Sequence, residues 1–366
     1  MKAKAVTSVT WIVVLACYSL NYSSYNPTQQ SNTTSSKLSI KTGDTDGQWV
    51  WVGRNRTFDS PTCCNWPPWR GGKFADAYIE HLKSNNCKTA TDKDFELTLY
   101  HGDPVHPSPR GGCVGSGDGC DNFFDEYSWQ SSELPSFDAN RTCHLLGEKR
   151  VLLIGDSTSQ QTASTIMNAL PTCNTQIYHA ISDTLVNMTS FGGLNRGKAW
   201  KQWVEEIKPG IVVLSVGAHI KTNDTSYEYI IDRVLGEIEL MRKVNPNIKF
   251  AWRTQAPAGC AKYPISPDNA TKAAEMSMQI DEYNHGRFFH RDTMLVSKLD
   301  KIGMPFLDLR ILYSRMDGHP SSQNYEDDVV SKMYYEGDDC LHWCNPGPLD
   351  IMARLFQKLL MTLSND

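Results

Sequence analysis

The chain has 366 residues, with 36 lysines and arginines against 41 aspartates and glutamates, and a formal net charge of −5. This length suffices for one large domain with an appendage, so we expect a single main core. The charges form no long run of one sign, which argues against a nucleic-acid-binding surface, because phosphates require a basic patch. A neutral or weakly polar substrate fits this balance better.

The N-terminus has the pattern of a secretory leader. Lys2 and Lys4 precede an apolar run over residues 5–20. The run is shorter than the roughly 20 residues that cross a bilayer comfortably, which favours a cleaved signal peptide. The positive flank also suits an uncleaved type II signal anchor. Either alternative sends the rest of the chain into the secretory pathway, with possible membrane anchoring through residues 5–20.

Cysteines and glycosylation motifs agree with that placement. Of 11 cysteines, one lies in the leader, and the even number that remains favours disulfides in an oxidising lumen, although their pairing does not follow from the sequence. Seven Asn-x-Ser/Thr motifs are spread along the chain, at Asn21, Asn32, Asn55, Asn140, Asn187, Asn223 and Asn269.

The region before residue 149 divides into two segments after the leader. Residues 21–48 are rich in Ser, Thr, Asn and Gln, which predicts a flexible stem because few apolar groups are available for burial. Residues 49–148 contain six cysteines and show weak periodicity. We expect a loop-rich, disulfide-stapled subdomain there.

From residue 149 to 366, short apolar runs alternate with helical stretches, as in a parallel sheet covered by helices. We expect buried strands at residues 151–154, 211–216, 248–252 and 305–309, and helices at 159–170, 197–207, 227–244, 271–299 and 349–363. The sequence therefore predicts an α/β fold with three α/β/α layers. In such folds the site lies at the carboxyl ends of the strands.

Residues 155–157 read Gly-Asp-Ser, between a predicted strand and a predicted helix. This order places the hydroxyl of Ser157 at the edge of the sheet, where the free N–H groups of the helix can stabilise a developing oxyanion. Ser157 is therefore a candidate nucleophile. The alternative is that Asp156 and Ser157 only cap the helix.

A candidate base lies near the C-terminus, where residues 339–342 read Asp-Cys-Leu-His. His342 can accept a proton near neutral pH, and Asp339 can fix its tautomer. The alternatives are a surface aspartate with a structural histidine, and a zinc site formed with Cys340 and Cys344. The zinc site lacks a second ligand pair, so we expect no metal.

Together with residues 215–219, Ser-Val-Gly-Ala-His, these motifs resemble the SGNH, or GDSL-like, hydrolases. More narrowly, the chain resembles the plant trichome-birefringence-like proteins and their PC-esterase relatives, whose characterised members are Golgi polysaccharide O-acetyltransferases. The segments that carry the resemblance are residues 127–138, 155–157, 314–320 and 339–347. It extends from about Trp129 to the C-terminus, and the leader and stem fit a type II Golgi arrangement.

The resemblance implies a role for each matching residue. Ser157, Asp339 and His342 would form the triad, while Ser157, Gly217 and His219 would form the oxyanion hole. Arg253 matches an arginine of the family and would contact an oxyanion or acceptor, or be a surface charge at a strand end. Apart from the resemblance, the apolar face of the Trp343 ring suits stacking on a sugar, and the alternative is packing in the core. His319, between Gly318 and Pro320, is expected to be a turn residue.

The chain departs from the plant pattern at three places. Gln160 and Gln161 replace an Arg-Asn pair, Ala218 separates Gly217 from His219, and Ser132 stands where a cysteine is common. These differences leave the triad residues in place. They bear on the partner in the oxyanion hole and on the acceptor, so a xylan substrate is not carried over from the plant family.

Three functions follow as hypotheses. The first is an O-acetyltransferase that moves an acetyl group from a donor co-substrate to a glycan or polysaccharide hydroxyl through an acyl-enzyme, without a bound cofactor. The second is a secreted carbohydrate acetylesterase, in which water accepts the acyl group. The third is a catalytically silent glycan-binding protein. The expected location is the Golgi lumen or the cell exterior.

Overall fold

The computed structural model describes residues 47–52, 127–170, 173, 176–187, 197–221, 223–257, 285–319, 341, 343 and 348–365. The chain divides into two compact units, residues 1–39 and 40–366, and all described residues belong to the second unit. The predicted leader, most of the predicted stem, and the triad candidates Asp339 and His342 lie outside the described residues.

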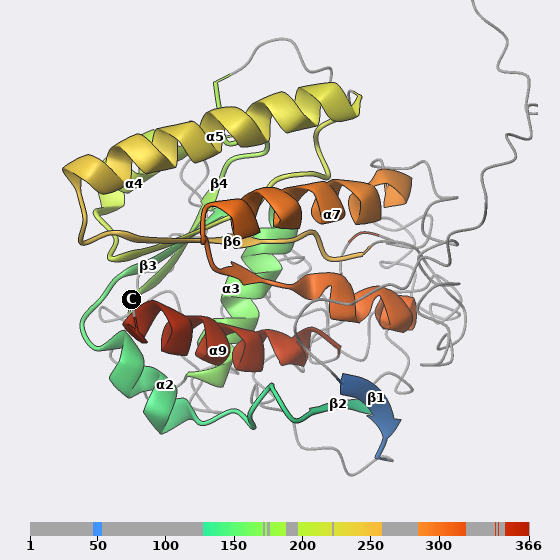
Figure 1. The fold of residues 1–366 in the computed structure, drawn as a ribbon. Helices are drawn as coiled ribbons and strands as arrows, with labels where there is room; N and C mark the ends of the chain where they lie inside the picture. The colour runs from blue at the N-terminus through green and yellow to red at the C-terminus, as the bar shows by residue number, and fades with distance from the viewer. Residues whose placement is uncertain are drawn as a thin grey trace, which may run out of the picture. The chain divides into compact units, whose positions relative to one another are not determined.

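A five-stranded parallel sheet forms the centre of the described fold (Figure 1). Its spatial order is β4 (Ile177–Ile181), β3 (Val151–Gly155), β5 (Ile211–Leu214), β6 (Lys249–Arg253) and β7 (Phe306–Leu307). The side chains of β3 and β5 are buried on both faces of the sheet, which explains their continuous apolar sequences. The predicted α/β fold with a parallel sheet is confirmed.

Helices cover both faces of the sheet. On one face, Val151 and Val213 share a core with residues of α3 (Ser157–Ala169) and α9 (Ile351–Asn365). On the other face, Leu152 and Leu214 share a core with residues of α4 (Trp200–Ile207), α5 (Asp224–Val244) and α7 (His285–Lys301). The alternation of strand side chains thus builds two cores and three layers.

The four predicted strands are all present, with shifted ends. The strand predicted at 305–309 contributes only Phe306 and Leu307, because Asp308 caps the 3-10 helix η4 (Leu309–Gly318) by accepting from the Arg310 N–H. A second 3-10 helix, η6 (Pro348–Asp350), leads into α9. Strand β4 was not predicted, because its short sequence Ile-Tyr-His-Ala-Ile carries a polar residue at its centre.

Part of the segment predicted to be loop-rich joins the same core as the sheet. Strand β1 (Gly47–Trp51) pairs antiparallel with β2 (Tyr127–Ser131), and the paired residues Trp49 and Trp129 pack edge to face at 5.5 Å between ring centroids. The Trp49 Nε1 donates to the Ile311 carbonyl at 3.1 Å. These indoles are buried beside residues of α3 and α9.

Helix α2 (Ala139–Leu146) is held at both of its ends. At its start, the Gln357 side chain on α9 accepts from the Asp138 N–H at 2.7 Å and donates to the Ser136 carbonyl at 3.1 Å. Near its end, Cys143 forms a disulfide with Cys173, which follows α3. The sequence predicted disulfides but not this pair. The domain boundaries at residues 48 and 148 stay a prediction.

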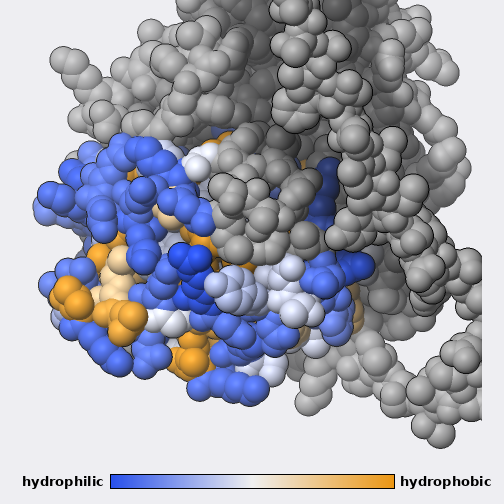
Figure 2. Space-filling view, turned by 90° about the horizontal axis from the view of Figure 1, so that it is seen from above, coloured by the Kyte–Doolittle hydropathy of each residue, from blue (hydrophilic) through white to orange (hydrophobic). Residues whose placement is uncertain are grey.

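The outer surface on the side of α5 is mostly hydrophilic, with separate hydrophobic spots (Figure 2). The large apolar side chains exposed on α5 are Tyr229, Leu240 and Val244. Among the described helices, none has both the length and the apolar character that a membrane span requires.

Candidate active site

Ser157 is the first residue of α3 and follows β3 after a single turn residue, Asp156. The side chain of Asp156 caps the helix by accepting from the Thr158 N–H at 2.9 Å. Asp156 and Thr158 are buried, whereas Ser157 is partly exposed. The predicted strand, turn and helix are therefore present, with the serine at the one position of the three that reaches the surface.

The turn requires glycine at position 155. A Cβ at this position would collide with the Ser159 side chain and would lie 2.8 Å from the Ser215 carbonyl oxygen. The Ser215 N–H also donates to the Ile154 carbonyl at 2.9 Å. The ends of β3 and β5 are thus in direct contact beside Ser157.

The segment after β5 is held from the end of β6. Gln255 donates through Nε2 to the Val216 carbonyl at 2.6 Å and to the Ser215 hydroxyl at 3.0 Å. A Cβ at Gly217 would lie 2.7 Å from the Gln255 Cγ and Cδ atoms, so the side chain of Gln255 packs directly on the Gly217 backbone. After β3 the chain forms β4 on one side of β3 and then crosses over to form β5 on the other side. Ser157 follows β3 and Gly217 follows β5, so both lie where the strand order reverses, which is a usual location for ligand sites in parallel sheets.

Arg253, at the end of β6, lies buried beneath these turns. Its Nη2 lies 2.7 Å from the hydroxyl oxygens of both Thr158 and Ser215, and donates to them. Burial lowers the pKa of the Arg253 guanidinium, although the carboxyls of Asp156 and Asp292 favour its charged form. Arginine remains a cation in proteins, so Arg253 places a positive charge behind the start of α3.

The buried carboxyl of Asp156 balances that charge. Burial by itself would raise its pKa, but His219, Arg253 and two hydrogen bonds from Thr158 outweigh burial and lower the pKa below its ordinary value. Asp156 is therefore ionised at neutral pH. Its position at the N-terminus of α3 also favours negative charge through the helix dipole.

His219 packs on the β4 side of the site. Its Nε2 lies 3.7 Å from Oδ1 of Asp183, which follows β4, and both side chains are buried. His219 is close enough to Asp156 to affect the pKa of that carboxyl. The structure thus brings His219 and Gly217 to the same edge as Ser157, while their participation in an oxyanion hole stays a prediction.

The sequence analysis missed two buried titratable residues, one in β4 and one in α7. His179 of β4 is buried, and burial lowers its pKa to about 4, so its imidazole is neutral at pH 7. Asp292 of α7 accepts from the Gln255 N–H at 3.0 and 3.1 Å, and burial raises its pKa to about 8. No local motif marks either residue, because their shifts arise from long-range packing.

Leu341 and Trp343, the residues on either side of position 342, are described, and both contact segments that follow the strand ends. The Trp343 N–H donates to Gln161 Oε1 at 3.0 Å, and Gln161 Nε2 donates to the Trp343 carbonyl at 2.9 Å. Leu341 is buried in a small cluster with Ala218 and Phe288. Two positions at which the chain departs from the plant pattern, Gln161 and Ala218, therefore contact the segment that carries the predicted base.

The two predicted substrate-binding residues are buried. The Nη2 donor of Arg253 is directed to internal hydroxyls, and the Trp343 ring packs against His319 with 4.3 Å between centroids. Both side chains are at most 1% exposed, so each has an internal role in this structure. Their contact with substrate stays a prediction.

The alternative zinc ligands Cys340, His342 and Cys344 lie outside the described residues. Within the described part of the chain, no group of three or more His, Cys, Asp or Glu side chains is placed to hold a metal.

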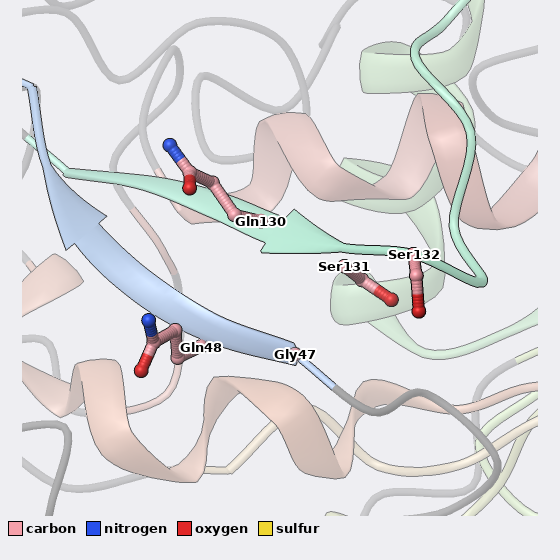
Figure 3. Close-up of a pocket in the computed structure, with 5 residues that line it drawn as sticks. All are labelled: Gly47, Gln48, Gln130, Ser131 and Ser132. Carbon is pink, nitrogen blue, oxygen red and sulfur yellow. The ribbon is translucent and has the colours of Figure 1, made fainter.

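A shallow depression of about 600 Å³ lies along β1 and β2 (Figure 3). Its lining comprises Gly47, Gln48, Gln130, Ser131 and Ser132. The Ser131 hydroxyl already accepts from the Glu133 and Leu134 N–H groups. None of the lining residues belongs to the strand ends around Ser157.

Comparison with known proteins extends these observations. Residues 220–359 match the PC-Esterase family model, described as a GDSL/SGNH-like acyl-esterase family found in Pmr5 and Cas1p. The matched range contains positions 339 and 342 and begins after Ser157. Protein trichome birefringence-like 20 of Arabidopsis thaliana is 30% identical over 151 residues, which are 38% of this chain and 29% of that protein. The match thus spans less than a third of the relative's length.

Two solved structures show weak similarity. A GDSL-like lipase from Bacteroides thetaiotaomicron has a TM-score of 0.33 and 16% identity, covering 59% of this chain and 89% of the lipase. The N-terminal part of a Bacteroides fragilis protein, containing a phosphatase domain complexed with Mg, has a TM-score of 0.30 and 14% identity, covering 61% of this chain and 55% of that one.

The parallel sheet defines an α/β protein, and its C-terminal part is similar to the GDSL/SGNH-like acyl-esterases. Within that part, residues 220–359 are similar to the PC-esterase family. The chain is a distant homologue of trichome birefringence-like 20.

Proposed function

We propose that this protein is a serine-dependent O-acyltransferase that moves an acetyl group to a glycan hydroxyl through an acyl-enzyme. The observation that carries the proposal is the partly exposed Ser157 at the start of α3, with both neighbours of His342 packed against the same edge of the sheet. The family's description as acyl-esterases supports acyl chemistry at this serine.

The flanking contacts support His342 as the base. The main chain of Trp343 is hydrogen-bonded to Gln161, which lies one helical turn after Ser157 in α3. Leu341 packs with Ala218, the residue after Gly217. We therefore assign the role of base for Ser157 to His342, the residue between these two anchors in the sequence. Asp339, three residues earlier, would orient the imidazole and stabilise its protonated form.

The proposed reaction has two acyl-transfer steps. His342 takes the proton of the Ser157 hydroxyl, whose oxygen attacks the carbonyl carbon of an acetyl donor. The N–H groups of Ser157 and Gly217, with His219, stabilise the oxyanion, and the leaving group departs with the proton from His342. A glycan hydroxyl then attacks the carbonyl carbon of the acetyl-serine and gives its proton to His342. As the bond between the acetyl group and the Ser157 oxygen breaks, His342 returns this proton to Ser157. No bound cofactor takes part.

Hydrolysis is the second candidate function, since the matched family is described as acyl-esterases. In that case water replaces the glycan hydroxyl in the second step. The two functions share the first step and differ only in the acceptor.

A secretory location accompanies the proposal. The disulfide between Cys143 and Cys173 suits an oxidising compartment. The asparagines of three predicted glycosylation motifs, Asn140, Asn187 and Asn223, are exposed. We place the protein in the Golgi lumen, as a type II membrane protein, or outside the cell, where glycan acceptors are present.

The test uses the full chain produced through a secretory pathway. Purified protein is offered an isotope-labelled acetyl ester and a panel of glycans, and transfer and hydrolysis are measured separately. Ser157→Ala should abolish both while leaving the melting temperature nearly unchanged, because alanine is tolerated in a first helical turn. Retention of wild-type turnover by Ser157→Ala would exclude the serine mechanism. Absence of acetyl release from the wild type would favour a glycan-binding protein without catalysis.

A further inference from the structure

We propose that Gln161 is a positioning residue, which sets the base His342 relative to Ser157 by holding the main chain of Trp343. This inference rests on the proposed function. It concerns the geometry of the site and is independent of the identity of donor or acceptor.

The contact is a reciprocal pair of hydrogen bonds between one side-chain amide and one peptide unit. Gln161 Oε1 accepts from the Trp343 N–H at 3.0 Å, and Gln161 Nε2 donates to the Trp343 carbonyl at 2.9 Å. The exposed fractions of Gln161 and Trp343 are 2% and 0%, so water does not compete for these groups. The pair fixes both the distance and the direction of the Trp343 backbone.

The same helix carries the nucleophile and this amide. Ser157 and Gln161 are four residues apart in α3, which places them on one face of the helix, about one turn apart. Behind them, Ala163 and Ile166 are fully buried, so the helix is held in the core. Position 343 is therefore fixed relative to Ser157 through one rigid element, and the candidate base is the residue directly before it.

The Trp343 ring is anchored independently of Gln161. It packs against His319 at 4.3 Å between centroids, and a Cβ at Gly318 would lie 2.9 Å from the ring. Loss of the Gln161 amide should therefore leave the indole in the core but release the Trp343 peptide. The expected effect is a small change in the position of the neighbouring base with limited unfolding, and misplacement of a catalytic group by about 1 Å can cost on the order of 10²-fold in rate.

Gln357 provides a matched control. It is also a glutamine buried to 1% exposure, and its amide also holds a distant segment, through the Asp138 N–H and the Ser136 carbonyl. This contact lies at the start of α2 rather than beside Trp343. Gln357→Ala should lower stability as much as Gln161→Ala without moving the base.

The experiment measures the reactivity of Ser157 in the full-length protein. Wild type, Gln161→Ala, Gln161→Asn and Gln357→Ala are treated with a fluorophosphonate, and p-nitrophenyl acetate hydrolysis is followed at a temperature below every melting transition. Gln161→Ala should lower the labelling rate and kcat by about 10²-fold with KM little changed. Gln161→Asn, which is too short by one methylene, should also be slow, whereas Gln357→Ala should react like the wild type.

Wild-type labelling rates in the folded Gln161 variants would overturn the inference while leaving the proposed function intact. If Gln161→Ala does not fold, Gln161→Asn decides in the same way, because it keeps an amide in the core. Equal slowing by Gln357→Ala would also overturn it, since the effect would then follow stability alone. Failure of the wild type to label at Ser157 would overturn the inference together with the proposed function.

Discussion

Arg253 shows how a buried charge can support a surface serine without reaching the surface. Its Nη2 group joins the hydroxyls of Thr158 and Ser215, which follow different strands. The ionised carboxyl of Asp156 lies close enough to favour this cation. The attraction between the Arg253 guanidinium and the Asp156 carboxylate, together with their hydrogen bonds, offsets the cost of removing both charges from water. The network also joins the two strand ends that approach Ser157.

Asp292 is the residue for which this structure predicts a pH effect. Its pKa in the folded chain, about 8, lies above its ordinary value of 3.8 because the carboxyl is buried. Between about pH 4 and 8 the unfolded chain loses this proton while the folded chain keeps it, so this group lowers stability as the pH rises. Asp292→Asn, which does not ionise, should gain stability relative to the wild type across that range.

The measurement is the free energy of urea unfolding of wild type and Asp292→Asn, with disulfides intact, at pH 4, 6 and 8. Asp300→Asn, at an exposed position on the same helix, controls for the lost charge. Parallel curves for wild type and Asp292→Asn would show that Asp292 does not titrate in this window.

At the scale of elements, the close approach of two strand ends depends on small residues. Gly217, after β5, lies under the side chain of Gln255, which follows β6 and binds the Ser215 hydroxyl and the Val216 carbonyl. A larger residue at position 217 would displace Gln255 and break these bonds. The cost should appear in both stability and activity, because the same turn presents the candidate oxyanion N–H.

Gly217→Ala should therefore destabilise the protein by about 1–3 kcal/mol, the usual cost of overpacking, and should slow acyl transfer. Gly236→Ala is the matched control, because Gly236 lies within α5 and a Cβ there meets nothing within 4 Å. That substitution should raise stability by roughly 0.5–1 kcal/mol through helix propensity. Thermal unfolding measures both effects, and a neutral Gly217→Ala would contradict the packing argument.

At the scale of the whole molecule, the disulfide between Cys143 and Cys173 ties α2 to the segment between α3 and β4. It closes a loop of 30 residues in sequence separation. A disulfide that closes a loop of this size lowers the conformational entropy of the unfolded chain. In the chain-entropy model this raises the free energy of unfolding by about 3–4 kcal/mol. The bond is consistent with the oxidising compartment that the proposed function assumes.

Protein recovered from a secretory host should therefore carry N-glycans and few free thiols. Thiol titration of the denatured, unreduced chain and the mass shift after glycan removal test this directly. Replacing Cys143 and Cys173 together by serine should lower the melting temperature. Most cysteines reacting in the unreduced wild type would contradict the secretory placement.

Local sequence was sufficient for the elements that carry their own signals. Apolar runs predicted β3, β5 and β6 because these strands are buried on both faces. Gly155 and Asp156 predicted the turn and cap that precede Ser157, because those preferences act over a few residues. Helix α7 begins at His285, whereas its predicted start at residue 271 lies outside the described residues.

Other features depend on partners distant in the sequence. Strands β1 and β2 are short, and their tryptophans become core residues only by packing near α9. The buried environments of Arg253 and Asp292 arise where β6 and α7 meet the turns after β3 and β5. Gln161 and Trp343 are 182 positions apart, and no local preference specifies their pairing. The sequence by itself thus determined the turn that presents Ser157 and the α/β class, since these follow from short-range periodicity and capping. Only the tertiary structure decided which side chains surround the serine, because burial and charge compensation depend on contacts between distant segments.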